Sequence, residues 1–327
     1  MAYTTIDKPS DYFETKLYTG NGGTQSITGL DFAPSWVWIK RRSSTQKHGL
    51  YDTVRGATKV LASDATDAEA THDALTAFGT DGFTLGNIGR TNTNNETYVA
   101  WSWKETATAG FDIVAYTGTG SSNAVSHSLS ATPNMMIIKN RDDTDSWYVW
   151  HQSLGAVASN YINLDTVDPA SSVDNGIIAL SSSNFTVNTR GDVNENTMKY
   201  IAYCFAEKKG YSKFGSYTGN GNADGTFVYT GFKPAFVIVK NTSINENWSM
   251  HDHKRNDAVI PNFARLTPDD NQAEAANTTF AKVELLSNGF KLGGTADVIN
   301  DASVKFIFMA FAENPFVTSG GVPATAR

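Results

Sequence analysis

A five-residue pattern that occurs three times constrains the fold of this chain more than any other feature of its sequence. The pattern, Tyr-Thr-Gly-x-Gly, begins at Tyr18, Tyr116 and Tyr217. Each occurrence is followed, in the same order, by a proline, a lysine six residues later, a phenylalanine, and an aromatic residue seven positions before a glutamate. These anchors are Pro34, Pro133 and Pro234; Lys40, Lys139 and Lys240; Phe83, Phe185 and Phe290; Tyr98, Tyr200 and Phe306; and Glu105, Glu207 and Glu313. Such repetition indicates that one structural unit is present three times.

The anchors divide the 327 residues into five segments. We predict β repeats at residues 12–106, 110–208 and 211–314, with an N-terminal arm at 1–11 and a C-terminal tail at 315–327. The joints between repeats are too short to be flexible tethers, so the repeats should pack in a nearly fixed arrangement. The arm and the tail are candidates for partner-binding segments or for loose chain ends.

The apolar pattern predicts strands. Residues 34–40 and 234–240 carry apolar side chains on both faces of an extended segment, which indicates a central strand covered on both sides, with the closing lysine exposing its charge. The chain is rich in Gly, Asn, Thr and Ser, and only 18% of its residues are charged. We therefore predict an all-β fold of three tandem, homologous, β-sandwich-like domains.

Two local features refine this prediction. Asn21-Gly22 and Asn220-Gly221 are the pair favoured in two-residue hairpins, so the signature glycines are interpreted as turn residues and not as a phosphate cradle. Residues 66–75, echoed at 272–276, have a helix-like composition, and Thr66 with Glu69 could form a capping box. Short helical turns in the loops are expected there.

Composition excludes several classes of function. The net charge is −7 and no stretch clusters Lys and Arg, which argues against nucleic acid as a partner. No apolar run reaches the roughly 20 residues of a membrane helix, and we expect no membrane insertion. The single cysteine, Cys204, lies in an apolar run and is expected to be a buried thiol. The N-terminus lacks a secretory signal pattern, so synthesis in a cytoplasm is expected.

An acidic residue and an arginine recur three positions apart in two repeats. Asp52 and Arg55 match Asp252 and Arg255, whereas the middle repeat has His151 and Leu154. Such pairs most often form local ion pairs, and we interpret both as structural, with ligand binding as the alternative.

A second group of residues is predicted to form a contact surface, because aromatic or imidazole side chains stand among polar neighbours. Its members are Trp147, Trp150, Trp248, His251 and His253. Exposed aromatic rings beside polar groups are typical of sugar-binding surfaces. His251 and His253 are two apart and would share one face of a strand, so a metal site is an alternative, but the sequence names no third ligand.

No catalytic motif is present. The chain lacks a Gly-x-Ser-x-Gly elbow and a Walker-type loop, and the recurring glutamates are expected to form hydrogen bonds or salt bridges at the junctions between repeats. A polysaccharide depolymerase would need two converging acidic residues, which the sequence does not identify. We expect a non-enzymatic protein without cofactor or metal.

Four passages resemble a domain family of uncharacterised function found in tailed phages, notably marine ones. They are residues 8–13 (KPSDYF), 50–56 (LYDTVRG), 200–207 (YIAYCFAE) and 213–221 (KFGSYTGNG). The resemblance covers nearly the whole chain and carries no catalytic residues with it.

The resemblance implies a virion structural protein made in the host cytoplasm, of the tail, fibre or adhesin type, whose loops contact the host or neighbouring virion proteins. Its partners would be other virion proteins and further copies of itself in a homo-oligomer, with a host surface glycan as an additional candidate. A capsid decoration or collar protein, and a carbohydrate-binding module, are the alternatives.

Overall fold

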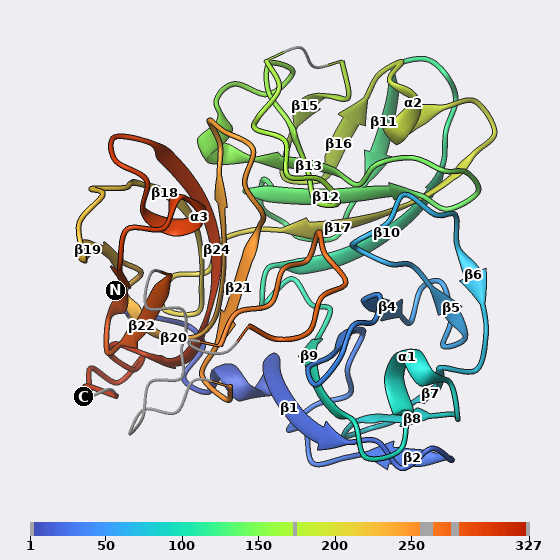
Figure 1. The fold of residues 1–327 in the computed structure, drawn as a ribbon. Coiled ribbons are helices and arrows are strands. Elements are labelled where there is room, and N and C mark those ends of the chain that lie inside the picture. The colour runs from blue at the N-terminus through green and yellow to red at the C-terminus, as the bar shows by residue number, and fades with distance from the viewer. Residues whose placement is uncertain (1–2, 173–174, 256–263, 276–280, 325–327) are drawn as a thin grey trace.

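The computed structural model describes residues 3–172, 175–255, 264–275 and 281–324, and its fold is all-β, as predicted (Figure 1). Within those residues the α-helices are four residues long. Figure 1 shows the three repeats around a common centre, with the third at the left, the second at the top and the first at the lower right.

The first repeat contains one large and one small antiparallel sheet. Its elements are η1 (Pro9–Asp11), β1 (Phe13–Thr19), β2 (Gln25–Ile27), β3 (Trp36–Arg41), β4 (Gly49–Asp52), β5 (Lys59–Val60), β6 (Ala70–Thr71), β7 (Leu75–Phe78), β8 (Phe83–Leu85), α1 (Gly89–Asn92) and β9 (Thr97–Trp103). The large sheet has the strand order β1-β9-β3-β4, and the small sheet has the order β2-β8-β7. β5 and β6 form a separate two-stranded pair.

The second and third repeats follow the same plan. The second contains β10 (Phe111–Thr117), β11 (Asn123–Ser126), β12 (Met135–Asn140), β13 (Tyr148–His151), η2 (Gln152–Leu154), β14 (Ile162–Asn163), β15 (Ile177–Leu180), β16 (Asn184–Val187), α2 (Gly191–Asn194) and β17 (Lys199–Phe205). The third contains β18 (Ser212–Thr218), β19 (Asp224–Tyr229), β20 (Phe232–Asn241), β21 (Ser249–Asp252), β22 (Lys282–Leu286), β23 (Gly289–Gly293), α3 (Asp297–Asn300) and β24 (Lys305–Pro315).

The strand order is common to the three repeats. The large sheets are β10-β17-β12-β13-β14 and β18-β24-β20-β21, and the small sheets are β11-β16-β15 and β19-β23-β22. In each repeat the first strand therefore pairs with the last, and the second strand starts the small sheet. The four strands that the large sheets share have one order, and β14 is an additional edge strand of the second repeat.

The predicted two-sided strands are central strands that separate two apolar cores. All six residues of β3 are buried, and β3 lies between β9 and β4. Trp36 and Trp38 point into a central core, while Val37 and Ile39 point into a core under the small sheet of the same repeat. Alternation along the strand thus serves two different cores.

The central core is shared by all three repeats. Aromatic rings meet across the repeats in pairs: Trp36 with Phe205 at 6.1 Å, Phe205 with Phe311 at 6.1 Å, and Phe311 with Phe13 at 5.4 Å between ring centroids. Each large sheet carries a small sheet on one face only, so its other face is buried against the neighbouring repeats. The repeats are more tightly integrated than sandwiches joined end to end.

The signature tyrosine fastens the first strand of each repeat to the short helix. The hydroxyls of Tyr18, Tyr116 and Tyr217 donate to main-chain oxygens in or next to α1, α2 and α3 at 2.6–2.7 Å. Each ring also stacks on the aromatic anchor of the last strand, as Tyr18 does on Tyr98 with centroids 5.1 Å apart.

The two glycines of the signature are required for different steric reasons. A Cβ at Gly20 would lie 2.2 Å from the main-chain oxygen of Thr93, and the same close approach recurs at Gly118 and Gly219. Gly22 has a φ of +72°, a conformation that side-chain-bearing residues rarely adopt. The interpretation of these glycines as turn residues is therefore confirmed.

The hairpin prediction attached to those glycines is wrong. β1 pairs with β9 and β2 pairs with β8, so the turn at Asn21-Gly22 carries the chain from the large sheet to the small one. The corresponding strands of the third repeat, β18 and β19, also belong to different sheets.

A buried asparagine holds each of these turns and was not singled out in the sequence. The Asn92 amide donates to the carbonyls of Gly23 and Gly86, and its oxygen accepts from the backbone N–H of Asn21. Asn194 and Asn300 make equivalent contacts. Their constant position, six residues before the aromatic anchors Tyr98, Tyr200 and Phe306, is the signal that could have revealed them.

The expected helical turns at 66–75 and 272–276 are also wrong. The first segment contains β6, residues 272–275 form no helix, and residue 276 lies outside the described part of the chain. The backbone N–H groups of Glu69 and Glu274 donate to the main-chain carbonyls of Arg141 and Arg42, respectively, each at 2.8 Å and each in a neighbouring repeat. Contacts between repeats thus replace the hydrogen bonds of a helix.

We predict that Asn92→Asp lowers the free energy of unfolding by about 3 kcal/mol, because a carboxylate oxygen would face carbonyls where the amide now donates. Urea denaturation followed by tryptophan fluorescence measures the change. Asn94→Asp, at an exposed position two residues away, is the control and should alter stability by less than about 0.5 kcal/mol. Equal effects of both substitutions would contradict the role assigned to Asn92.

Candidate functional site

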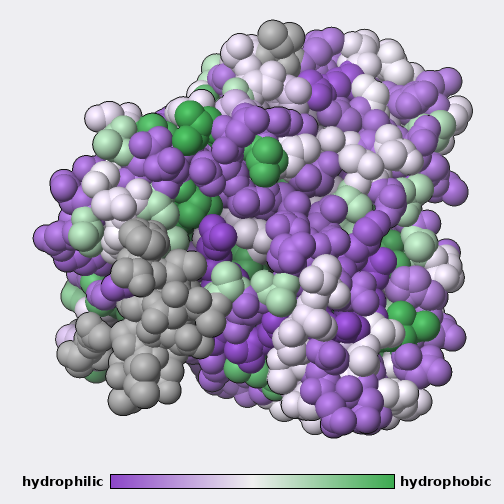
Figure 2. All heavy atoms as spheres, viewed as in Figure 1, coloured by the Kyte–Doolittle hydropathy of each residue, from purple (hydrophilic) through white to green (hydrophobic). Residues whose placement is uncertain are grey.

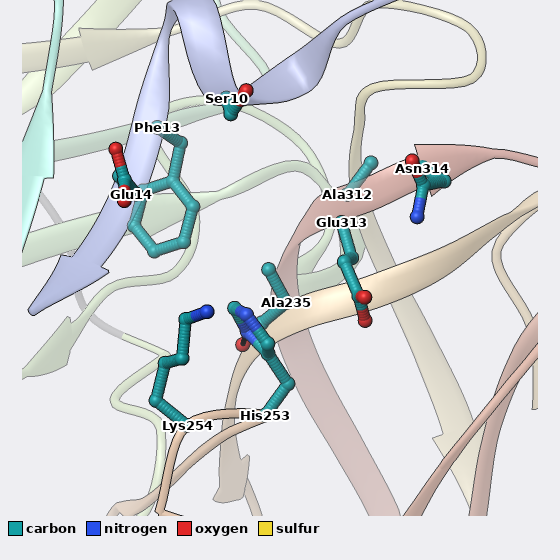
Figure 3. A pocket seen from close by; sticks show the side chains of 9 residues that line it. All are labelled: Ser10, Phe13, Glu14, Ala235, His253, Lys254, Ala312, Glu313 and Asn314. Carbon is teal, nitrogen blue, oxygen red and sulfur yellow. Dashed lines mark hydrogen bonds between the residues drawn. The ribbon is translucent and has the colours of Figure 1, made fainter. Parts of the chain in front are cut away.

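An open pocket of about 240 Å³ lies where the start of the first repeat meets the third (Figure 3). It is lined by Ser10, Phe13, Glu14, Ala235, His253, Lys254, Ala312, Glu313 and Asn314. The carboxylates of Glu14 and Glu313 are each paired with a lysine, Lys16 and Lys233, at 3.0 Å. Both carboxylates of the pocket are thus engaged in ion pairs.

The polar groups concentrate instead at the seams, which we define as the three contacts between repeats. One loop of each repeat lies against another repeat: 62–69 of the first against the second, 163–170 of the second against the third, and 267–275 of the third against the first. The first repeat thus contacts the second, the second contacts the third, and the third contacts the first.

Both predicted Asp–Arg ion pairs are present and lie at the seams. Arg55 Nε donates to Asp52, and Arg255 Nε to Asp252, each at 2.5 Å with both side chains fully buried. The aspartates also bind a neighbouring repeat. Asp52 accepts from the Tyr203 hydroxyl at 2.7 Å, and Asp252 from Trp101 Nε1 at 3.0 Å.

A glutamate extends each ion pair into a network across the seam. Glu69 contacts Arg55 of its own repeat at 3.3 Å and Arg141 of the second repeat at 2.9 Å. Glu274 likewise contacts Arg255 at 2.9 Å and Arg42 of the first repeat at 2.8 Å. The arginine pairs lower the pKa of Glu274, although burial opposes them.

The seam between the second and third repeats lacks this network. Leu154, Ala170 and Thr242 replace the two arginines and the glutamate, while Ala170 N–H still donates to the Thr242 carbonyl at 3.0 Å. His151 replaces the aspartate, and its Nε2 lies 3.1 Å from the Phe308 carbonyl. The backbone hydrogen bond of the seam is thus kept while the charges of the Asp–Arg–Glu network are absent.

Four of the five residues predicted to form a contact surface are buried, so that prediction is wrong for them. Trp147 and Trp248 each donate from Nε1 to a carbonyl of a neighbouring repeat, Ala62 at 2.8 Å and Asn163 at 2.9 Å. Their polar sequence neighbours suggested exposure, but a loop from another repeat covers them. Trp150 is also buried.

The two histidines differ in position. His251 is fully buried within 2.7 Å of Ser249 Oγ, and burial lowers its pKa to about 3. Only the partly exposed His253 lines the pocket, with Nδ1 3.1 Å from the Ala235 carbonyl (Figure 3). His251 is enclosed and His253 is partly exposed, so the two imidazoles do not present one common exposed face. Among the described residues, no cluster of three potential metal ligands occurs.

The recurring lysines do not expose their charge, contrary to the sequence prediction. Lys40 Nζ donates to the Asn271 carbonyl at 3.1 Å, and Lys240 Nζ to the Val167 carbonyl at 2.8 Å, in each case across a seam. Lys139 Nζ donates to carbonyls of its own repeat. Burial lowers the pKa of all three lysines to about 8.

Sequence reasoning missed Glu69 and Glu274 as seam residues because the loops that carry them differ in length. Glu69 follows Arg55 by 14 positions, and Glu274 follows Arg255 by 19. No fixed register marks them. The recurring Glu105 and Glu207, expected at the junctions, do bind there: each accepts from a backbone N–H of the next repeat, Ile113 and Phe214.

The fold and the seams define an all-β protein whose buried polar groups hold three repeats together. A family model described as a domain of unknown function, DUF7483, matches residues 8–315, and the chain belongs to this family. A search of curated proteins finds no match. Over the described residues, no helix has the length and apolar character required to span a bilayer.

We expect Glu274→Ala to lower the free energy of unfolding by about 3 kcal/mol, because it leaves Arg255 buried without one of its partners. Chemical denaturation measures the loss. Ala170→Ser changes the equivalent position of the seam that lacks the network and should have an effect below about 1 kcal/mol. A similar loss in both variants would show that the network adds nothing to the seam.

Proposed function

We propose that this protein is a non-enzymatic structural component of a phage particle, of the tail, fibre or adhesin type. In this proposal three homologous β-sandwich-like domains, at 12–106, 110–208 and 211–314, form one rigid body that presents its loops to other proteins. The placement in a virion rests on the resemblance of residues 8–13, 50–56, 200–207 and 213–221 to proteins of tailed phages.

The structural role is supported by the buried charged groups, which are engaged in contacts between repeats. Arg55, Arg255 and their acidic partners are fully or largely buried in ion pairs, and Lys40 and Lys240 bind carbonyls across seams. An active site would instead place such groups around a cleft. A body locked in this way suits a protein that must hold its loops in fixed relative positions.

Assembly into a homo-oligomer and contact with other virion proteins belong to the same proposal. The covered faces of the large sheets are already used within the chain, so partners would contact the loops and the small sheets. A capsid decoration or collar protein would use the same rigid body, and the position on the particle distinguishes these versions.

A carbohydrate-binding role is the second candidate, and exposed aromatic side chains on β19 favour it. Phe227 is 44% and Tyr229 is 53% exposed, and residues two apart in a strand share one face. The equivalent positions in the other repeats, by the pairing of the small sheets, hold small residues: Ser26, Thr28, Ala124 and Ser126. Aromatic rings on a fixed strand can stack on sugar rings.

Mass spectrometry of purified particles tests the virion proposal. We expect the intact chain in particles of a phage that encodes it, and no release of reducing ends when the purified protein is incubated with host polysaccharide. A non-structural protein of the same phage serves as the control for contamination. Absence of the chain from the particles, or hydrolysis abolished by one carboxylate substitution, would contradict the proposal.

Substitution of the aromatic pair tests the second candidate. The double variant Phe227→Ala, Tyr229→Ser should reduce retention of the protein on host polysaccharide by about tenfold or more, because it removes two stacking surfaces. Leu17→Ser, which changes an exposed apolar residue of the first repeat, should leave retention unchanged. Equal retention of all three proteins would remove β19 as a glycan-binding surface.

A further inference from the structure

The joint between the first and second repeats places two carboxyl groups opposite each other. Thr106 and Phe111 form a reciprocal pair of backbone hydrogen bonds at 3.0 and 3.2 Å. Glu105 precedes this pair and Asp112 follows it, so their side chains stand on opposed positions of an antiparallel bridge. Like charges directly opposite one another destabilise such pairing.

Both carboxyl groups are held in place by backbone donors. The N–H of Ile113 donates to Glu105 at 3.1 Å, and the N–H of Ser128 donates to Asp112 at 2.6 Å. Asp112 is buried and Glu105 is partly buried. The carboxyl groups are therefore fixed near each other and cannot turn freely into solvent.

The charged groups around this pair do not neutralise it. Asp52 adds further negative charge, and the described residues include no ion pair to Glu105 or Asp112. The nearby Lys104 lies with its Nζ 5.6 Å from the centre of the Tyr12 ring. Cys204, opposite Asp112 in β17, is a buried thiol whose pKa is raised by burial, and it carries no charge at neutral pH.

Two further polar groups face the joint. His127, beside Ser128, has Nδ1 accepting from Leu129 N–H, and its Nε2 lies 3.2 Å from the Ser181 carbonyl. The Cε atom of Lys208, which bears the ammonium group, lies close to Gly110. Among the described residues, neither of them forms an ion pair with Glu105 or Asp112.

The other joint provides an internal comparison. Glu207 occupies the position of Glu105, and Lys213 occupies that of Asp112, four residues before the signature tyrosine. Glu207 and Lys213 form an ion pair at 3.6 Å. Opposite charges thus meet at the second joint, where like groups meet at the first.

We propose that the joint between the first and second repeats is a proton-dependent clamp. A proton shared between Glu105 and Asp112 holds the joint closed, and loss of this proton leaves two opposed anions that loosen it. This inference concerns the mechanics of the chain and does not depend on the proposed function.

The pH range of the clamp follows from the environment of Glu105. Burial, and hydrogen bonding to Asp112, raise the pKa of Glu105 from 4.5 to about 7. Because the folded state holds the proton more tightly than the unfolded state, the stabilisation is complete below pH 4.5 and is lost as the pH rises through about 7. The joint should therefore loosen above neutral pH.

Hydrogen exchange of the full-length protein tests the clamp. At about pH 8.5, after correction for intrinsic exchange, amides of residues 105–113 should open roughly tenfold more often than at about pH 5.5. Amides of residues 207–214, at the ion-paired joint, should show no such change. Glu105→Gln keeps an acceptor for Ile113 and can donate to Asp112, so it should abolish the difference at the first joint.

Two controls separate the clamp from a general response to pH. Glu207→Gln should leave the pH dependence of the first joint intact, and Asp112→Asn should abolish it as Glu105→Gln does. The inference would be overturned if the first joint opened equally at both pH values, if both joints changed together, or if the dependence survived in Glu105→Gln.

Discussion

Burial of the second face of each large sheet is the constraint on which the rest of this structure depends. A small sheet covers one face of each large sheet, and the other face carries rings such as Trp36, Phe205 and Phe311. Apolar burial contributes roughly 25 cal/mol per Å², so faces of this size could not remain in water. The repeats bury them against one another, and this shared core fixes where the seams lie (Figure 1).

Packing large sheets together brings polar backbone groups and loops into the interior. Contacts at the seams provide hydrogen-bond partners for these groups. Lysine ammonium groups and tryptophan N–H groups donate to carbonyls of neighbouring repeats, and the Asp–Arg–Glu networks pair their own charges. Buried polar groups are costly unless they are hydrogen-bonded. The seam between the second and third repeats shows that the network can be replaced as a whole, because Leu154, Ala170 and Thr242 leave none of its charges unpaired.

The inward orientation of the large apolar faces also determines the character of the outer surface that a partner would contact. Figure 2 shows a mainly hydrophilic outer surface with scattered apolar residues on the face in view, as expected when the large apolar faces are turned inward. Variation between repeats is therefore most informative at exposed positions. Phe227 and Tyr229 are exposed aromatic residues at positions where the other two repeats have small ones, so packing of the apolar cores does not account for the difference.

The sequence alone determined the features that recur in a fixed register. The three repeats follow from anchors that recur in the same order, beginning at Tyr18, Tyr116 and Tyr217. The all-β class, the two-sided strands and the Asp52–Arg55 and Asp252–Arg255 pairs follow from patterns within a few residues of each other, because strand periodicity and short-range pairing are local. Only the tertiary structure decided that Trp147 and Trp248 are buried, that the lysines are enclosed, and that Glu69 and Glu274 complete the networks. Except for Lys139, which binds carbonyls of its own repeat, the partner comes from another repeat through a loop of variable length, and no local pattern encodes that distance.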